Sequence, residues 1–156
     1  MAIIYVALGS NEGDREEQVL RAVHEMRSFS RVKKISTLIE TLPQDVDGVQ
    51  DKFFNAVVEL ETDFDPEEVL DELLAIEEDM GRNMDEKGKA LPRGIDLDLI
   101  AYEEQVYESD RLQVPHPKMT QRKFVVGPFA ELNPQWTHPI EKKKITDILK
   151  EFPEDE

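Results

Sequence analysis

Two aspartates spaced two residues apart, Asp96 and Asp98, carry the chemistry that is easiest to interpret in this chain. They alternate with Ile95, Leu97 and Leu99, so an extended strand places both carboxylates on one face and the apolar side chains on the other. Hard oxygen ligands, in a chain without cysteine and with no histidine nearby, favour Mg²⁺, which takes substrate phosphates as further ligands. The alternative is an ordinary exposed strand face.

The strand that carries these aspartates is predicted to be buried beyond them. Their face continues with Ile100 and Tyr102, which are apolar or aromatic. The two carboxylates are therefore expected at one end of a strand that is otherwise covered on both sides.

A histidine between two prolines follows in the segment Pro115-His116-Pro117. Proline on both sides holds the backbone extended and rigid. Such a histidine suits a positioned donor to a phosphate oxygen or an acid–base group near neutral pH, and a simple loop histidine is the alternative. Arg122 is close enough in sequence to act beside it.

Phe53 and Asn55 share one face of another predicted strand. An aromatic ring with a neighbouring amide can stack on a flat heterocycle and hydrogen-bond to its edge. A packed Phe and a capping Asn fit the same pattern, so these two residues are only candidates for a binding site.

The positions of these residues depend on a scaffold that the hydrophobic pattern predicts. Strands are expected at residues 3–8, 32–40, 53–62 and 95–102, with a turn-forming loop at 9–13. Capping boxes begin helices after Asp14 and Asp65, and Gly81 ends the second helix. This order predicts an α+β, ferredoxin-like βαββαβ fold, an antiparallel sheet with helices on one face. A hairpin at 106–114 and helices near 123–131 and 145–151 complete the prediction.

Length and charge limit the classes of function. The chain has 156 residues, which suits a single domain with one core over about residues 3–135 and an acidic tail at 153–156. Its net charge of -16 disfavours nucleic acid and anionic membranes as partners, and no apolar run is long enough to span a bilayer. The absence of cysteine agrees with a cytoplasmic location. In such an acidic chain, Arg82, Arg93, Arg111 and Arg122 are candidate anion-binding residues.

Five short motifs, taken together and in order, resemble hydroxymethyldihydropterin pyrophosphokinase of the folate pathway. The resemblance spans most of the chain. The motifs are Ala-Leu-Gly-Ser-Asn-Glu-Gly-Asp14, Phe53-Phe-Asn-Ala-Val57, Glu77 with Gly81-Arg82, Pro92-Arg-Gly-Ile-Asp-Leu-Asp98, and Val114-Pro-His-Pro-Lys-Met119 with Arg122-Lys-Phe124.

The resemblance implies a ferredoxin-like enzyme with defined substrates and site residues. The substrates implied are MgATP and 6-hydroxymethyl-7,8-dihydropterin, and the products are AMP and the pterin diphosphate. Asp96 and Asp98 would bind two Mg²⁺ ions and, with Arg82 and Arg93, form the catalytic set. The ATP-binding residues implied are Arg82, Arg93, Arg111, His116, Arg122 and Glu77. The pterin-binding residues implied are Leu42, Pro43, Phe53, Asn55 and Phe124.

Loops at residues 43–52 and 83–92 match segments that close over substrates in the resembled family. The second of them departs from the family pattern at Met84, where a basic residue is usual, and at Ala90-Leu91, where Trp-Gly is common. We expect the chemistry to survive while the closed state is held less well. A paralogue that acts on another heterocyclic alcohol and a catalytically silent ligand-binding domain are the competing hypotheses. A monomer is expected.

Overall fold

A five-stranded antiparallel sheet with helices on both faces forms the computed structural model, which describes residues 1–10, 15–41, 53–80 and 95–153. The strands are β1 (Ala2–Ser10), β2 (Arg31–Ile35), β3 (Ile39–Thr41), β4 (Phe53–Thr62) and β5 (Asp96–Tyr102). Their order is β2-β4-β1-β5, with β3 also paired to β4. This arrangement confirms the predicted α+β, ferredoxin-like fold class. The helices of the βαββαβ unit lie on one face, as predicted, and the helices on the other face come from the C-terminal part of the chain.

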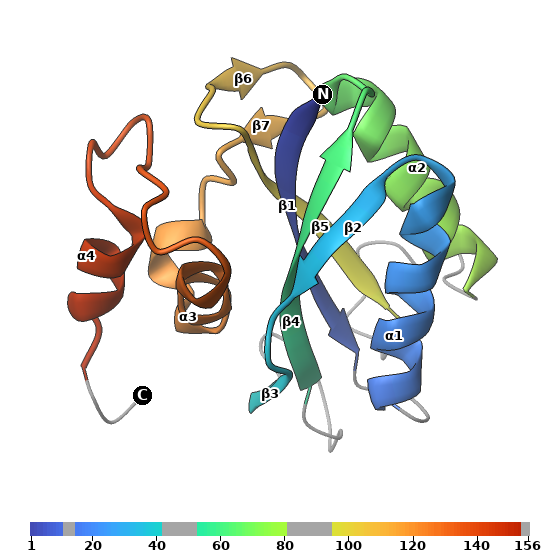
Figure 1. Cartoon of the computed structure of the whole chain (residues 1–156), viewed down its shortest axis with the longest axis horizontal. Helices are drawn as coiled ribbons and strands as arrows, with labels where there is room; N and C mark the ends of the chain where they lie inside the picture. Colours follow the sequence, from blue (N-terminus) through green and yellow to red (C-terminus); the bar gives the residue numbers. More distant parts are fainter. Residues whose placement is uncertain (11–14, 42–52, 81–94, 154–156) are drawn as a thin grey trace.

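Helices α1 (Arg15–Glu25) and α2 (Pro66–Asp79) cover one face of the sheet (Figure 1). The predicted capping box begins α2, because the Asp65 carboxylate accepts the N–H of Glu68 at 2.8 Å and the Glu68 carboxylate accepts the N–H of Asp65 at 3.0 Å. Apolar side chains of both helices pack against alternate residues of β1, β4 and β5, such as Val6 and Leu97. A 3-10 turn, η1 (Met26–Ser28), continues α1.

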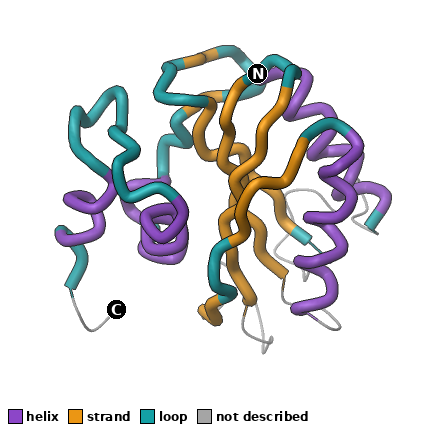
Figure 2. The backbone as a smooth tube through the Cα atoms, in the orientation of Figure 1, coloured by secondary structure: helices purple, strands orange, loops and turns teal. Residues whose placement is uncertain are grey.

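The other face of the sheet carries α3 (Lys123–Leu132), and α4 (Ile145–Lys150) lies on the side of α3 that is away from the sheet (Figure 2). A short hairpin of β6 (Tyr107–Glu108) and β7 (Gln113–Val114) and a 3-10 turn, η3 (Met119–Gln121), lead from β5 to α3. Tyr5 of β1 stacks on Phe129 of α3 with ring centroids 4.2 Å apart, and Trp136 packs beside them. The sheet therefore has a core on each side.

The strand predicted at residues 32–40 is divided into β2 and β3. The break falls at Ser36, which donates its N–H to the carbonyl of Val57 at 2.9 Å and accepts the N–H of Val57 on its hydroxyl at 2.9 Å. A side-chain oxygen thus replaces the backbone carbonyl of the ladder, and the chain leaves the regular strand path. Thr37 then turns towards Glu131 of α3, whose carboxylate accepts its N–H at 3.1 Å.

Two strand predictions need correction, one at the end of β1 and one at the end of β5. The loop predicted at 9–13 begins too early, because Gly9 and Ser10 still belong to β1 and pair with β4. Tyr102 does not share the face of Asp98 as expected. A register shift between Tyr5 and Val6 disturbs the alternation of β5, so that Tyr102 packs against the core on the side of α1 and α2.

Candidate active site

The two aspartates of β5 lie on the α3 side of the sheet at one end of the strand. Asp96 pairs with Gly9 and Asp98 with Ala7 of the neighbouring strand β1. Leu97 between them is buried in the opposite core, whereas Asp98 is exposed and Asp96 is half-buried. The predicted alternation of carboxylates and apolar side chains is confirmed.

An amide stands in the same row of the sheet as the first aspartate. Asn55 of β4 pairs with Gly9, and Gly9 pairs in turn with Asp96, so the three residues lie side by side across three strands and face the same way. Gly9 has no side chain, so no Cβ stands between the amide and the carboxylate in this row. Asn55 is 7% exposed, and its Nδ2 donates to the Thr41 hydroxyl at 2.7 Å.

A buried glutamate fixes the acidic end of β5 from the other side. Glu77 near the end of α2 is 3% exposed, and its Oε2 accepts the N–H of Leu97 at 2.8 Å. That N–H belongs to the residue between Asp96 and Asp98. Glu77 was predicted to contact ATP, and this contact stays a prediction; the hydrogen bond to Leu97 is a role that sequence reasoning missed.

His116 is tied to β5 just beyond the aspartates. Its N–H donates to the carbonyl of Ile100 at 2.8 Å, and its Nδ1 accepts the N–H of Lys118 at 3.2 Å. In the neutral ring the remaining proton is therefore on Nε2. Burial lowers the pKa of His116, and the positive charges of Arg122 and Lys118 lower it further, while the charge of Asp98 opposes the shift. The structure thus brings His116, Asp98 and Arg122 into one electrostatic neighbourhood.

Arg122 and Phe124 lie where α3 begins. Arg122 is the residue before the helix, in an extended conformation, and its guanidinium carbon is 5.9 Å from the centroid of the Phe124 ring. Phe124 is half-buried against the core on the α3 side of the sheet. A cation and an aromatic ring therefore stand together on the same side of the sheet as the acidic pair.

Arg111, another predicted ATP-binding residue, makes its contacts away from this arrangement. Its guanidinium pairs with Glu67 at 3.2 Å and with Asp71, both in the first half of α2. Glu67 also accepts hydrogen bonds from the hydroxyls of Tyr107 and Ser109. Asp71 precedes Glu77 by six residues on α2, so in this structure Arg111 is held away from the acidic end of β5.

Several predicted site residues lie outside the described residues. The backbone of Phe53 pairs with Thr41 at the start of β4, but its side chain is outside the described part. Also outside are Arg82, Arg93, Leu42, Pro43, the loops at 43–52 and 83–92, and the departures at Met84, Ala90 and Leu91.

The donor atoms at the acidic pair suit a hard divalent cation shared with a substrate. Within residues 1–10, 15–41, 53–80 and 95–153, no three His, Cys, Asp or Glu side chains are grouped as a complete metal site. Two carboxylates with few other protein ligands match Mg²⁺, which keeps several waters and binds substrate phosphates. The residues present therefore fit this ion.

Comparison with known proteins identifies the family. Residues 5–134 match the family model described as 7,8-dihydro-6-hydroxymethylpterin-pyrophosphokinase (HPPK). The chain belongs to the HPPK family. HPPK enzymes transfer pyrophosphate in folate biosynthesis and use ATP as a co-substrate, as the resemblance of the sequence motifs implied.

Individual relatives agree with this family. The chain is 38% identical over 152 residues to a 2-amino-4-hydroxy-6-hydroxymethyldihydropteridine pyrophosphokinase of Aquifex aeolicus, covering 97% of this chain and 91% of that protein. It is 38% identical over 132 residues to the Bacillus subtilis protein of the same name, covering 83% and 77%. A folic acid synthesis protein of Dictyostelium discoideum is 35% identical over 137 residues, which are 88% of this chain but 20% of that protein.

The solved structures agree with the fold of an HPPK domain. The wild-type HPPK-DHPS crystal structure of Plasmodium falciparum superposes with a TM-score of 0.76 at 14% sequence identity. The match covers 96% of this chain and 44% of that chain, so this HPPK chain spans less than half of that larger protein. Among the described residues, no helix has both the length and the apolar character needed to cross a membrane.

Proposed function

We propose that this chain transfers the pyrophosphoryl group of ATP to the hydroxymethyl group of 6-hydroxymethyl-7,8-dihydropterin, and that Asp96 and Asp98 bind the Mg²⁺ ions for this reaction. The observation that carries the proposal is the row Asn55–Gly9–Asp96 across the sheet. It supports the proposal because an amide suited to a heterocycle and a carboxylate suited to a metal ion share one surface, with a glycine between them. Membership of the HPPK family supplies the reaction to which this surface is suited.

The reaction is a displacement at phosphorus. The hydroxymethyl oxygen forms a bond to the β-phosphorus of ATP, and the bond from that phosphorus to the oxygen shared with the α-phosphate breaks. AMP leaves with that oxygen, and the hydroxyl proton is released. Bound Mg²⁺ would neutralise phosphate charge and make the hydroxyl more acidic, so a dedicated protein base is unnecessary.

The polar residues of the site position the phosphates. Neutral His116 offers its Nε2–H to a phosphate oxygen, because Nδ1 is occupied by the N–H of Lys118. Arg122 supplies a fixed positive charge beside it, and Arg82 and Arg93 add two more from the segment that the structure does not describe. In a chain of net charge -16, these cations concentrate attraction for a polyanion at one place.

The pterin is recognised by shape and by hydrogen bonds. Phe124 offers one aromatic face, and we assign Phe53 to the other. Asn55, oriented by Thr41, donates and accepts at the edge of the ring system. The backbone at Leu42-Pro43 completes this pocket. Arg111 is assigned to the nucleotide side, and its release from Glu67 and Asp71 is part of nucleotide binding.

The oligomeric state, location and partners are also part of the proposal. We propose a monomeric cytoplasmic enzyme whose partners are ATP and a reduced pterin. A strongly acidic surface disfavours nucleic acid and anionic membranes. Elution of the purified protein at a dimer's volume in size-exclusion chromatography would contradict the monomer.

The function is tested by AMP formation when ATP, Mg²⁺ and the reduced pterin are mixed with the protein. We expect AMP and pterin diphosphate in equal amounts. Asp98→Asn should reduce kcat by at least about a hundredfold, since it removes a charged ligand of the ion. Asp63→Asn, an exposed aspartate in the turn after β4, is the matched control and should retain activity. Pterin binding without any AMP would support a silent binding domain and contradict the proposal.

A further inference from the structure

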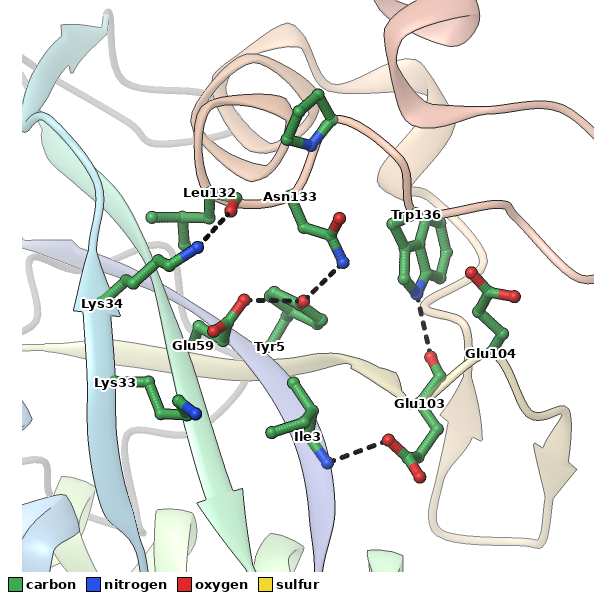
Figure 3. A pocket seen from close by; sticks show the side chains of 11 residues that line it. Ile3, Tyr5, Lys33, Lys34, Glu59, Glu103, Glu104, Leu132, Asn133 and Trp136 are labelled. Atoms are coloured by element: carbon green, nitrogen blue, oxygen red, sulfur yellow. Dashed lines mark hydrogen bonds between the residues drawn. The ribbon is translucent and has the colours of Figure 1, made fainter.

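A pocket lies on the α3 side of the sheet, away from the acidic pair. It has a volume of about 500 Å³ and is bounded by the first half of β1, by β2 and β4, and by the segments that follow β5 and α3 (Figure 3). Tyr5 and Ile3 in its floor precede Gly9 by four and six residues, or about 13–20 Å along an extended strand. The volume suits a small ligand. Nothing in the proposed reaction uses this pocket.

A buried carboxylate without an ion pair among the described residues faces this pocket; Lys34 stands opposite it in the register of β2 and β4, but the Nζ of Lys34 donates to the carbonyl of Leu132. Glu59 is 7% exposed, and its Oε1 accepts the hydroxyl of Tyr5 at 2.8 Å. Asn133 donates to the same hydroxyl at 2.9 Å, which leaves the tyrosine proton directed to Glu59. Within the described part of the chain, no Lys or Arg nitrogen lies within 4.0 Å of the Glu59 carboxylate. Buried carboxylates are normally paired, so this site favours a cationic group.

The walls of the pocket carry opposite charges. Lys33 and Lys34 lie on the β2 side, and Glu103 and Glu104 lie on the side that follows β5 (Figure 3). Lys34 donates to the carbonyl of Leu132 at 3.1 Å. Lys33 makes no hydrogen bond or ion pair with another described residue, so its ammonium group is available to an anion.

The carboxylates opposite are held by backbone groups, which leaves part of their acceptor capacity for a ligand. Glu103 accepts the N–H of Ile3 at 3.0 Å, and Glu104 accepts the N–H of Thr137 at 3.0 Å. An ionised carboxylate has about four acceptor positions, of which these single bonds use one. The acidic wall is therefore fixed in place and can still accept hydrogen bonds from a cation.

We propose that this pocket binds a small zwitterion, with an ammonium group at Glu59 and a carboxylate at Lys33. A simple anion would meet Glu59, Glu103 and Glu104, and a simple cation would leave Lys33 without a counter-charge. A molecule with both charges satisfies both walls, as an amino acid or a short peptide would. This site is independent of the proposed pyrophosphokinase reaction.

Trp136 provides a direct measurement, because it lines the pocket and is the only tryptophan of the chain. Its indole N–H donates to the carbonyl of Glu103 at 2.9 Å, so its NMR resonance reports on the acidic wall. We would titrate the full chain with ε-aminocaproate, hexylamine and caproate. The zwitterion should bind about tenfold more tightly than either single-charge analogue. Equal affinity for ε-aminocaproate and hexylamine, or no saturable shift with any probe, would overturn the proposal.

Two variants test the proposed sites of the ligand's ammonium and carboxylate groups separately. Glu59→Gln keeps an acceptor for the Tyr5 hydroxyl but removes the negative charge. It should therefore lower the affinity for ε-aminocaproate by about tenfold or more. Lys33→Gln should reduce the affinity for ε-aminocaproate to that for hexylamine. Glu61→Gln, two residues further along β4 and outside the pocket lining, is the matched control and should bind as the unaltered chain does. Unchanged affinity in Glu59→Gln would contradict the assignment of the ammonium group.

Discussion

The carboxylate of Glu77 accepts the backbone N–H of Leu97 at 2.8 Å, and this bond joins α2 to the strand segment that carries both aspartates. Because Leu97 lies between Asp96 and Asp98, the position of each carboxylate depends on a buried side chain from another element. The end of β5 that we propose to bind metal is thus held in place by a buried residue of α2, which need not touch the metal.

Replacing Glu77 should damage both stability and metal binding. Glu77→Ala leaves the N–H of Leu97 buried without an acceptor, which costs about 1–3 kcal/mol in the free energy of unfolding. We also expect a higher Mg²⁺ concentration at half-maximal activity, because Asp96 and Asp98 lose their fixed spacing. Urea unfolding and a Mg²⁺ titration of activity measure the two effects.

Two further variants control this prediction. Glu77→Gln retains a carbonyl acceptor, so its Mg²⁺ concentration at half-maximal activity should be close to that of the unaltered chain. Glu78→Ala changes the exposed neighbour on α2 and should alter neither quantity appreciably. A normal Mg²⁺ dependence in Glu77→Ala would mean that Glu77 does not position the aspartates.

Thr41 should affect recognition of the pterin through Asn55. Thr41→Val removes the hydroxyl that accepts from Asn55 Nδ2 at 2.7 Å, so the amide is less well oriented. We expect KM for the pterin to rise by about five- to tenfold, with kcat little changed, since one hydrogen bond is worth about 1 kcal/mol. Thr41→Ser should restore KM, and a loss of kcat alone would argue against this role.

His138 should make the protein less stable in mild acid. Its Nδ1 accepts the N–H groups of Ile140 and Glu141, and burial lowers its pKa from the usual 6.5, with the charge of Glu141 opposing the shift. As the pH falls through 6.5, the unfolded chain takes up this proton before the folded protein does. The free energy of unfolding therefore decreases from that pH down to the lower pKa of the folded state.

The variant His138→Asn isolates this contribution. Its side-chain oxygen can accept the same backbone N–H groups but does not titrate. Urea unfolding at a series of pH values from about 7.5 to 5 should show a shallower loss of stability in the variant. Parallel curves for the two proteins would show that His138 does not cause acid sensitivity.

The departures in the loop at 83–92 give a prediction from sequence alone. Met84 and Ala90 stand where a basic residue and a tryptophan are usual in the family. If the closed state is held less well for this reason, the double variant Met84→Arg, Ala90→Trp should raise kcat or lower KM. Steady-state kinetics measure both constants, and no gain in either would count against the hypothesis.

Local alternation predicted the acidic pair correctly because β5 is regular at that end. The period-two pattern of Ile95 to Leu99 places the aspartates on one face, as observed. The same rule failed for Tyr102, because a register shift against Tyr5 and Val6 depends on the partner strand rather than on the sequence of β5. The prediction therefore held where pairing is regular and failed at the irregularity.

Long-range contacts of the site could not be read from the sequence. Glu77 and Leu97 are 20 residues apart in the sequence, and the hydrogen bond between them depends on how α2 packs against β5. The row of Asn55, Gly9 and Asp96 depends on the registers of two strand pairs. Ser36 interrupts the predicted second strand through a side-chain bond to Val57. Family motifs nevertheless pointed to Asn55 and Asp96 without revealing this geometry.

The most direct test is a crystal structure of the protein with the reduced pterin, a nonhydrolysable ATP analogue and Mg²⁺. We predict that the carboxylates of Asp96 and Asp98 bind the ions that contact the phosphates, with the pterin edge at Asn55. Ions bound elsewhere, or a pterin on the opposite face of the sheet, would contradict the central claim.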